Sequence, residues 1–351
     1  MSYQRTKRPH EFYQALPKVE LHRHLEGSMR LNTLIEIGRS HGIEIMGTGY
    51  LRSLVQIGED EPYTCDNFLS KFAALRVFYR SPEVIGRVTR EAIEDAAIDN
   101  VRYLELRFTP VALSRAEDFP LDEVMDWVIE SAQAGEKEYG VITRLIASVN
   151  RHESVELAEQ VTSLAIERKD AGIVGLDLAG GEANSPATPF IGLFREAQQD
   201  GLQITIHAGE WGGAPNVFEA IKEFGVKRIG HGVRIMEDAS TVAIARERET
   251  VFEVCITSNY QSGVVPVLKK HPFPQMLSAG LNATLNTDDP SVSQITLSDE
   301  YRLACEELGV PVSVLAGRIL AAAQAAFLPE EERYQLGQSL EKELSKFKTR
   351  G

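Results

Sequence analysis

The segment 202-LQITIHAGE-210 is typical of a strand in a parallel sheet, because it is short and apolar and ends in polar residues. The same pattern recurs along the chain, with apolar residues at helical spacing in between, as in 121–134 and 239–249. The apolar segments are 18–22, 101–108, 141–149, 172–179, 202–207, 226–231, 251–256 and 281–286. Strand and helix in eightfold alternation predict an α/β fold, a (β/α)₈ TIM barrel.

The first connection is much longer than a single crossover helix requires. About 78 residues, from Arg23 to Asn100, separate the first two apolar segments. Helical patterns occur in this connection near 30–42, 66–79 and 82–100. We therefore expect a helical insertion between strands 1 and 2, over about residues 30–100, that lies over the barrel mouth as a candidate lid.

The chain after the last apolar segment also continues in helical patterns. Pro311 suits the first turn of an Ala- and Leu-rich helix over 312–328, and Pro329 suits the start of another over 329–347. We expect these extra C-terminal helices to follow the barrel. Because no internal repeat or low-complexity tract interrupts the chain, we interpret residues 1–351 as a single domain.

Composition and charge exclude several classes of protein. Hydrophobic residues make up 43% and charged residues 25% of the 351 residues, which excludes collagen-like and disordered chains. The formal net charge is −14, and no segment forms the basic patch that a polyanion binder requires. We therefore expect neither a nucleic-acid polymer nor a membrane as a partner, whereas a small uncharged nucleoside is compatible with this charge. Composition leaves the oligomeric state open.

The cysteines and the N-terminal segment indicate the compartment. Cys65, Cys255 and Cys305 are odd in number and lack C-x-x-C spacing, which excludes a disulfide framework and a cysteine zinc site. The N-terminal segment has no signal-peptide core, and no later segment reaches the roughly 18 apolar residues of a membrane helix. We therefore expect a cytoplasmic protein.

Polar residues gather at the ends of the predicted strands, where barrels of this kind carry their active sites. These residues are His22, His24, Asp177, His207, Glu210, His231, Asp288 and Asp289. The remaining histidines have no such position, and we interpret them as surface or helix histidines. They are His10, His41, His152 and His271.

A pair of histidines follows the first strand pattern. In 19-VELHRHLEG-27, strict alternation places Glu20, His22, His24 and Glu26 on one face of an extended chain and the apolar residues on the other. Two imidazoles two residues apart on one face can bind one cation, as zinc hydrolase sites require. A hydrogen-bonded pair of barrel histidines is the alternative. Alternation also turns Arg23 outward, where no role is assigned to it.

Two later segments could complete such a site. The fifth strand pattern ends in His207, and Glu210 follows after a turn, where a carboxylate can act as a general acid/base without binding the metal. After the last strand pattern, one of Asp288 and Asp289 could complete a mixed His/Asp site, and the other would face bound water or substrate. A structural histidine and a helix cap are the alternatives for these segments.

The segment 228-RIGHG-232 adds His231 between two glycines, which allow close approach of backbone and ligand. In isolation, the pattern favours a core histidine bonded to the backbone. The combination is more specific than its parts. His-x-His, His, His and Asp-Asp follow one another at strand ends in the order that a single site would need.

These residues together resemble the adenosine deaminase family of the metal-dependent amidohydrolase superfamily. The resemblance runs from about Leu16 to about Leu340, and the His-x-His element alone is shared by the wider superfamily. The matching segments are 17-PKVELHRHLEGS-28, 175-GLDLAGGE-182, 206-IHAGE-210, 229-IGHG-232, 252-FEVCITSN-259, 286-NTDDP-290 and 327-FLPEEE-332.

The resemblance implies a role for each site residue. One Zn²⁺ per chain would be bound by His22, His24, His207 and Asp288. Glu210 would be the proton donor, and His231 and Asp289 would be the other catalytic residues. Substrate contacts would come from His24, Glu26, Asp289 and the backbone N–H of Gly180, with Glu26 at the ribose and Gly180 at the purine ring.

The resemblance also implies an activity: zinc-dependent hydrolytic deamination of adenosine and deoxyadenosine to inosine and deoxyinosine, in purine salvage. Two residues depart from the family pattern. Glu26 stands where adenosine deaminases typically have Asp, as it does in the related adenine deaminases, and Gly181 replaces an acid. Three alternatives follow from these residues: an adenine or aminodeoxyfutalosine deaminase, a metal-dependent amide or ester hydrolase, and a purine-binding barrel without catalysis.

Overall fold

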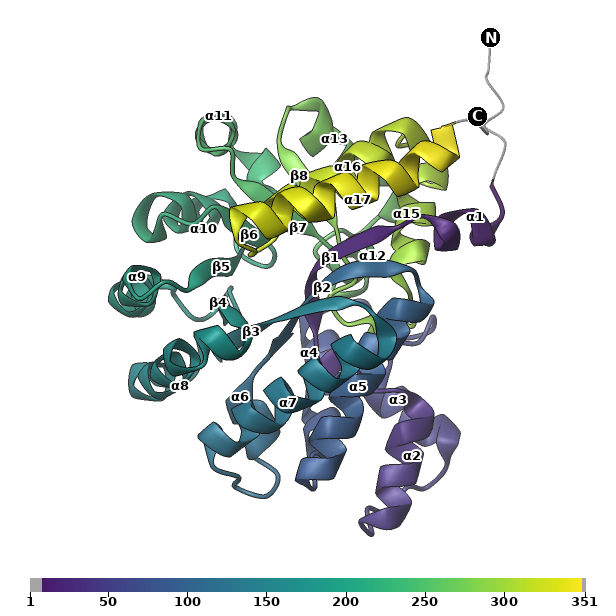
Figure 1. Cartoon of the computed structure of the whole chain (residues 1–351), viewed down its shortest axis with the longest axis vertical. Coiled ribbons are helices and arrows are strands. Elements are labelled where there is room, and N and C mark those ends of the chain that lie inside the picture. The colour runs from purple at the N-terminus through teal and green to yellow at the C-terminus, as the bar shows by residue number, and fades with distance from the viewer. Residues whose placement is uncertain (1–7, 349–351) are drawn as a thin grey trace.

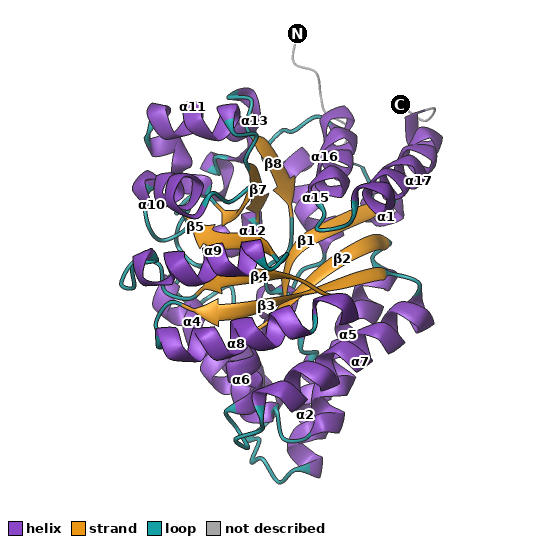
Figure 2. Ribbon diagram, turned by 60° about the vertical axis from the view of Figure 1, so that its left-hand side comes forward, coloured by secondary structure: helices purple, strands orange, loops and turns teal. Residues whose placement is uncertain are grey.

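Eight parallel strands pair in chain order, and helices surround them (Figures 1 and 2). The strands are β1 (Lys18–His24), β2 (Val101–Phe108), β3 (Ile142–Asn150), β4 (Ile173–Ala179), β5 (Gln203–Ala208), β6 (Arg228–His231), β7 (Val251–Val254) and β8 (Asn282–Leu285). Each apolar segment of the sequence contains or overlaps one strand, so the predicted (β/α)₈ barrel is confirmed. The computed structural model describes residues 8–348. Residues 1–7 and 349–351, the two ends of the predicted 1–351 domain, lie outside them, and residues 1–7 also belong to the segment judged to lack a signal peptide.

The barrel closes between β1 and the chain that follows β8. The Asp288 N–H donates to the His22 carbonyl at 2.9 Å, and the His24 N–H donates to the Asp288 carbonyl at 2.8 Å. The Asn286 side-chain oxygen accepts from the Leu21 N–H at 2.8 Å. Backbone pairing alone therefore places Asp288 beside the two histidines of β1.

The helices of the insertion are α2 (Leu31–Ser40), α3 (Thr48–Val55), α4 (Cys65–Leu75) and α5 (Pro82–Ile98). The sequence pattern missed α3, which is only 8 residues long. The α5 helix begins at Pro82, after the Ser81 hydroxyl caps the Val84 N–H, and packs against β2 and the α7 helix (Leu121–Tyr139). It thereby takes the place of the ordinary crossover helix.

None of the helices in residues 8–348 is both long and apolar enough to cross a membrane. The remaining helices lie around the outside of the barrel, and the last of them form the C-terminal part of the chain (Figure 2). These remaining helices are α1 (His10–Ala15), α6 (Pro110–Ser114), α8 (Val155–Glu167), α9 (Ile191–Gln199), α10 (Ala214–Glu219), α11 (Ala239–Glu247), α12 (Ile256–Gln261), α13 (Phe273–Ser278), α14 (Pro290–Ser293), α15 (Leu297–Glu306), and the expected extra helices α16 (Val312–Ala325) and α17 (Glu330–Lys348).

Strict alternation along β1 is wrong at one place. The pairing of β1 with β2 shifts register between Glu20 and Arg23, and the two side chains form a buried ion pair at 2.5 Å. Arg23 also donates to the Ala92 carbonyl of α5 at 3.0 Å, which puts the pair on the helix side of the strand. Glu20 is therefore not beside His22 and His24, and Arg23 is the cation that neutralises it.

Glu26 also departs from the predicted strand face. The β1 strand ends at His24, and Glu26 begins a short 3₁₀ helix, Glu26–Ser28. The Glu26 side chain still lies near the strand ends, because one of its oxygens accepts from the N–H of Thr109, the residue after β2.

The Glu20–Arg23 pair provides a test of the β1 bulge. We expect Arg23→Met to lower the free energy of unfolding by about 3–5 kcal/mol, because it leaves the Glu20 carboxylate buried without its cation. Urea denaturation measures this change. The matched double variant Glu20→Gln/Arg23→Met should recover part of the loss, and a double variant as unstable as the sum of its single variants would contradict a direct pairing.

Candidate active site

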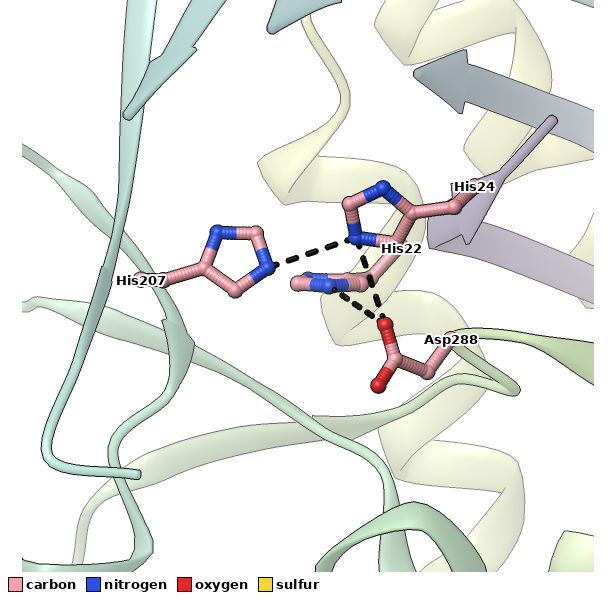
Figure 3. A group of neighbouring side chains, drawn as sticks. All are labelled: His22, His24, His207 and Asp288. Carbon is pink, nitrogen blue, oxygen red and sulfur yellow. Dashed lines mark hydrogen bonds and ion pairs between the residues drawn. The ribbon is translucent and has the colours of Figure 1, made fainter. Parts of the chain in front are cut away.

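Four potential metal ligands from three strand ends converge at the C-terminal end of the barrel (Figure 3). Ligand atoms of His22, His24, His207 and Asp288 all lie within 4.8 Å of one another. The Asp288 Oδ1 lies 3.2 Å from the His22 Nε2 and 3.3 Å from the His24 Nε2. The His24 and His207 Nε2 atoms are 3.3 Å apart.

The chemistry of this set fits a divalent cation. The His22 Nε2 is buried without a hydrogen-bond partner, so its lone pair is available. Burial lowers the pKa of His24 well below its usual range, which favours the neutral imidazole that a metal needs. Burial opposes ionisation of Asp288, but His231 and the other nearby imidazoles hold its pKa well below the usual value. Three imidazoles and one carboxylate suit a borderline-soft ion.

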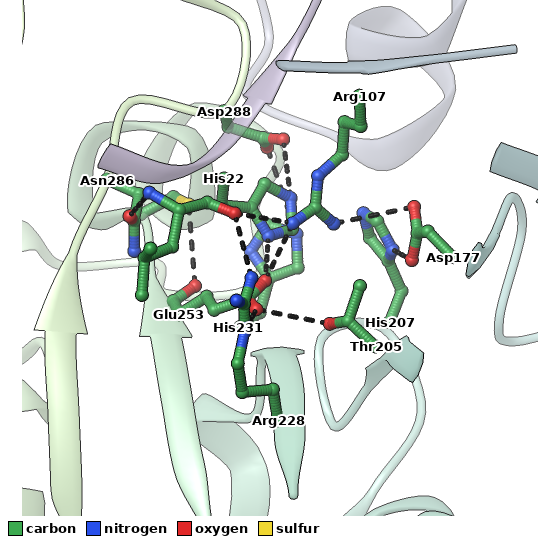
Figure 4. A network of polar contacts seen from close by, with 12 residues as sticks. His22, Arg107, Asp177, Thr205, His207, Arg228, His231, Glu253, Asn286 and Asp288 are labelled. Carbon is green, nitrogen blue, oxygen red and sulfur yellow. Dashed lines mark hydrogen bonds and ion pairs between the residues drawn. The ribbon is translucent and has the colours of Figure 1, made fainter. Parts of the chain in front are cut away.

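Two buried carboxylates orient the imidazoles from behind (Figure 4). The His22 Nδ1 lies 2.7 Å from a Glu253 oxygen, and the His207 Nδ1 lies 3.0 Å from an Asp177 oxygen. The Arg107 guanidinium contacts both carboxylates, at 2.8 Å and 3.4 Å respectively. Each imidazole therefore donates from Nδ1 and presents Nε2 to the cluster.

Glu210 and His231 complete the polar end of the site. The Glu210 carboxylate lies 3.6 Å from the His231 Nε2, which is itself 3.8 Å from an Asp288 oxygen. Burial, and then the charge of Asp288, raise the pKa of Glu210 well above its usual range. Burial and Asp288 likewise raise the pKa of Asp289. Glu210 and Asp289, which resist ionisation, therefore lie beside Asp288, which is held as a carboxylate.

The backbone reaches this arrangement through unusual conformations. His231 and Asp288 have φ of 61° and 65°, in the left-handed region that non-glycine residues rarely adopt. Gly230 packs so closely on the His22 ring that a Cβ would lie 2.9 Å from the His22 Cε1. A Cβ on Gly27 would lie 1.9 Å from an Asp289 oxygen. Close approach therefore requires glycine at both positions.

A cavity of about 400 Å³ opens in front of these groups. Apart from the fully buried His22, every residue predicted for the site lines it: His24, Glu26, Gly180, His207, Glu210, His231, Asp288 and Asp289. One Glu26 oxygen accepts from the Thr109 N–H at 2.7 Å, and the other is buried without a partner and free for a ligand. The volume and the convergent polar groups are typical of a small-molecule site.

A larger cavity, of about 930 Å³, lies at the opposite end of the barrel, where β4 to β8 begin. Cations line it, among them Lys169 after α8 and Arg246 in the last turn of α11. Helix dipoles favour positive charge at such helix ends. The helix ends therefore explain the positive charge of this cavity. None of the residues that the sequence predicts for the site lines it.

The chain resembles known proteins over nearly its whole length. The profile of the adenosine deaminase family matches residues 17–343. The chain belongs to the adenosine deaminase family. The adenosine deaminase of Klebsiella pneumoniae is 35% identical over 331 residues, which cover 93% of this chain and 98% of that protein.

Solved structures of related enzymes share the fold over nearly the whole chain. The adenine deaminase of Arthrobacter aurescens is 27% identical, with a TM-score of 0.87 over 94% of this chain and 99% of that one. An amidohydrolase from Burkholderia ambifaria with bound Zn is 25% identical, with a TM-score of 0.88 over 99% and 97%. The N6-methyl-AMP deaminase of Arabidopsis thaliana is 29% identical, with a TM-score of 0.83 over 95% and 98%.

One of the two departures from the family pattern lies next to a residue that binds the backbone of the catalytic loop. Gly181 lines the cavity, and no atom lies within 4 Å of where its Cβ would be. The next residue, Glu182, accepts from the N–H groups of Gly209, Glu210 and Gly212 at 2.6, 2.9 and 2.9 Å. Glu182 therefore holds the loop that carries Glu210, a role that sequence reasoning did not assign.

Other residues of this deaminase site were also missed. Arg76, His152 and Trp211 line the cavity, and α4 contributes Phe68 and Phe72. His152 is exposed, as expected, but it is part of the site. Nothing in the local sequence distinguishes these residues, because they come from loops and from the insertion.

The interpretation of His271 as a surface or helix histidine is wrong, because only 2% of it is exposed. His10 and His41 are exposed, as expected.

The orienting contact behind His207 can be tested directly. We expect Asp177→Asn to lower the affinity for Zn²⁺ by about 10- to 100-fold, because the His207 Nδ1–H loses its charged acceptor. Competition with a chelator measures the affinity. Ser148→Ala is the matched control, since it removes the bond to the other Asp177 oxygen at 3.0 Å without touching His207. Wild-type affinity in Asp177→Asn would contradict the orienting role.

Proposed function

We propose that this protein catalyses the zinc-dependent hydrolytic deamination of adenosine and deoxyadenosine to inosine and deoxyinosine. One observation carries the proposal: Glu210, a buried carboxyl with a raised pKa, faces the same cavity as the His/Asp cluster. A hydrolase acting on an amide or ester has no need of a proton at a ring nitrogen, whereas an aminopurine does. The relatives named adenosine deaminase favour the nucleoside over adenine.

His22, His24, His207 and Asp288 would hold the metal, and we propose zinc because the ligand set suits it and a structural relative has bound Zn. Zn²⁺ held by such a set lowers the pKa of water to near 7, which makes hydroxide available at neutral pH.

The chain's own groups account for the proton transfers. A bond forms between the oxygen of hydroxide and C6 of the purine while N1 takes up one proton. The hydroxyl proton then passes to the amino group, and the C6–N bond breaks to release ammonia. Glu210 holds the proton that ring nitrogen N1 takes up as oxygen adds to C6, and its raised pKa favours the protonated form that this step needs. Asp289 and His231, which line the same cavity, would orient the attacking oxygen.

The rest of the cavity fits a nucleoside. The unpartnered Glu26 oxygen would accept from a ribose hydroxyl, and the Gly180 N–H would contact the purine ring. Phe68 and Phe72 of α4 offer apolar surface on the side of the insertion, so α4 is the part of the expected lid that faces the substrate.

We place this reaction in purine salvage. Cys65, Cys255 and Cys305 form no disulfide, which is consistent with a reducing cytoplasm.

We expect Glu210→Gln to keep the metal and to lower kcat by about 10²- to 10⁴-fold, because an amide of nearly the same shape cannot deliver the N1 proton. Ultraviolet absorbance follows the conversion of adenosine, and elemental analysis follows zinc. Asp288→Ala should instead lose zinc and activity together. Near-normal turnover in Glu210→Gln would make Glu210 structural and the mechanism wrong.

We expect kcat/KM to be higher for adenosine and deoxyadenosine than for AMP or adenine. Adenine leaves one Glu26 oxygen buried without a partner, at a cost of about 1–3 kcal/mol, and a phosphate meets acidic side chains, among them the Asp288 carboxylate. Among the described residues that line the cavity, Arg76 is the sole arginine or lysine, so Arg76→Ala should reduce activity on AMP more than on adenosine.

The four substrates also separate the branches of the family. Glu26→Asp should change the ratio of nucleoside to free-base activity while the zinc content stays constant. A preference for adenine would move the protein to the adenine deaminase branch and overturn the nucleoside assignment.

A further inference from the structure

A buried line of hydrogen bonds runs from the backbone near α13 to His231. The Phe273 N–H donates to the His271 Nδ1 at 3.1 Å. The His271 Nε2 lies 3.3 Å from the Asn259 side-chain oxygen, and the Asn259 amide nitrogen lies 3.1 Å from the His231 Nδ1. His271 is 2%, Asn259 0% and His231 1% exposed, so the protein itself supplies every partner along this line.

The direction of each bond follows from the first one. A backbone N–H can only donate, so the His271 Nδ1 carries a lone pair and the proton of the neutral ring is on Nε2. Burial lowers the pKa of His271 to about 3, which keeps this ring neutral. His271 therefore donates to the Asn259 oxygen, and that amide turns its NH₂ group toward the next ring.

The amide determines the state of His231. An NH₂ group can only donate, so the His231 Nδ1 must accept and the ring proton must be on Nε2. The His231 Nε2 is the atom that lies 3.6 Å from Glu210 and 3.8 Å from Asp288.

We propose that Asn259 and His271 are positioning residues that fix His231 as the Nε2–H tautomer and so make it a hydrogen-bond donor at the reacting centre. The inference rests on the proposed deamination. His231 then donates to the oxygen that adds to C6 and stabilises its developing charge, and it cannot take a proton from water. The proton for N1 is left to Glu210 alone.

The tautomer matters because the two forms of imidazole offer opposite groups at the same place. His22 and His207 donate from Nδ1 to carboxylates and present a bare Nε2 to the metal cluster. His231, a few ångströms away, has an amide where they have a carboxylate, and it presents N–H instead. A carboxylate in place of the Asn259 amide would give His231 the tautomer of a metal ligand.

Asn259→Asp tests the proposal with almost no change in shape. A carboxylate only accepts, so it should draw the proton of His231 to Nδ1 and leave Nε2 bare. We expect kcat to fall by about 10²- to 10⁴-fold, as wrong-tautomer variants of other enzymes do, with KM changed less than about threefold and the zinc content unchanged. Activity within about threefold of wild type would overturn the proposal.

The tautomer itself can be read without any substrate. In zinc-loaded, ¹⁵N-histidine-labelled protein, we expect His231 to show a protonated Nε2 in the wild type and a protonated Nδ1 in Asn259→Asp, with the His231→Gln spectrum providing the assignment. A wild-type Nδ1–H would overturn the proposal even if the enzyme deaminates adenosine. A correct tautomer in a protein without deaminase activity would instead overturn the proposed function.

His271 provides a matched pair of variants. His271→Leu removes the donor to the Asn259 oxygen and lets that amide turn over, so we expect kcat to fall by about tenfold or more. In His271→Gln, the side-chain NH₂ can still donate to the Asn259 oxygen, and most of the activity should return. Equal loss in both variants, with an unchanged His231 spectrum, would reduce His271 to a packing residue and overturn its part of the proposal.

Discussion

The Glu253 carboxylate, buried on β7, connects four other strands of the barrel. One of its oxygens lies 2.7 Å from the His22 Nδ1 of β1 and accepts from Arg107 of β2 at 2.8 Å. The other accepts from Arg228 of β6 at 2.6 Å and from Thr205 of β5 at 3.2 Å. Burial opposes the charge of Glu253, but the two guanidiniums hold its pKa well below the usual range. Because an isolated ion would be very costly at this depth, the ring of partners and the carboxylate must be present together.

This ionic interior explains why the site can be rigid. A barrel filled with Leu and Val could be as stable, but apolar side chains cannot fix the rotation of an imidazole. Here the buried charges of the barrel also orient the two imidazoles of the cluster. Glu253 contacts the His22 ring, and Asp177 contacts the His207 ring. The candidate metal site and the core therefore share the same buried polar contacts, and a substitution deep in the barrel can alter the site without contacting it.

The sequence predicts the barrel and the cluster well for one reason: both depend on the periodicity of single strands and on the rule that parallel strands end at one edge. It fails where a side chain depends on a partner far along the chain. The bulge at Glu20 and Arg23 arises from the pairing with β2, and strict alternation cannot anticipate it. His271 lies outside any periodic segment, and its importance appears only when the fold brings Asn259 next to it. Arg76 belongs to the insertion, for which no strand rule applies.

The left-handed backbone at His231 and Asp288 limits what evolution can substitute there. Asn, Asp, His and Gly tolerate this conformation, whereas β-branched side chains do not, so selection for folding narrows the choice before any selection for catalysis acts. A descendant that gave up the reaction would be free to lose the carboxylate of Asp288 but not the conformation of the chain. Gly or Asn at that position, with the strands around it unchanged, would indicate a member of the family that has lost its catalytic activity.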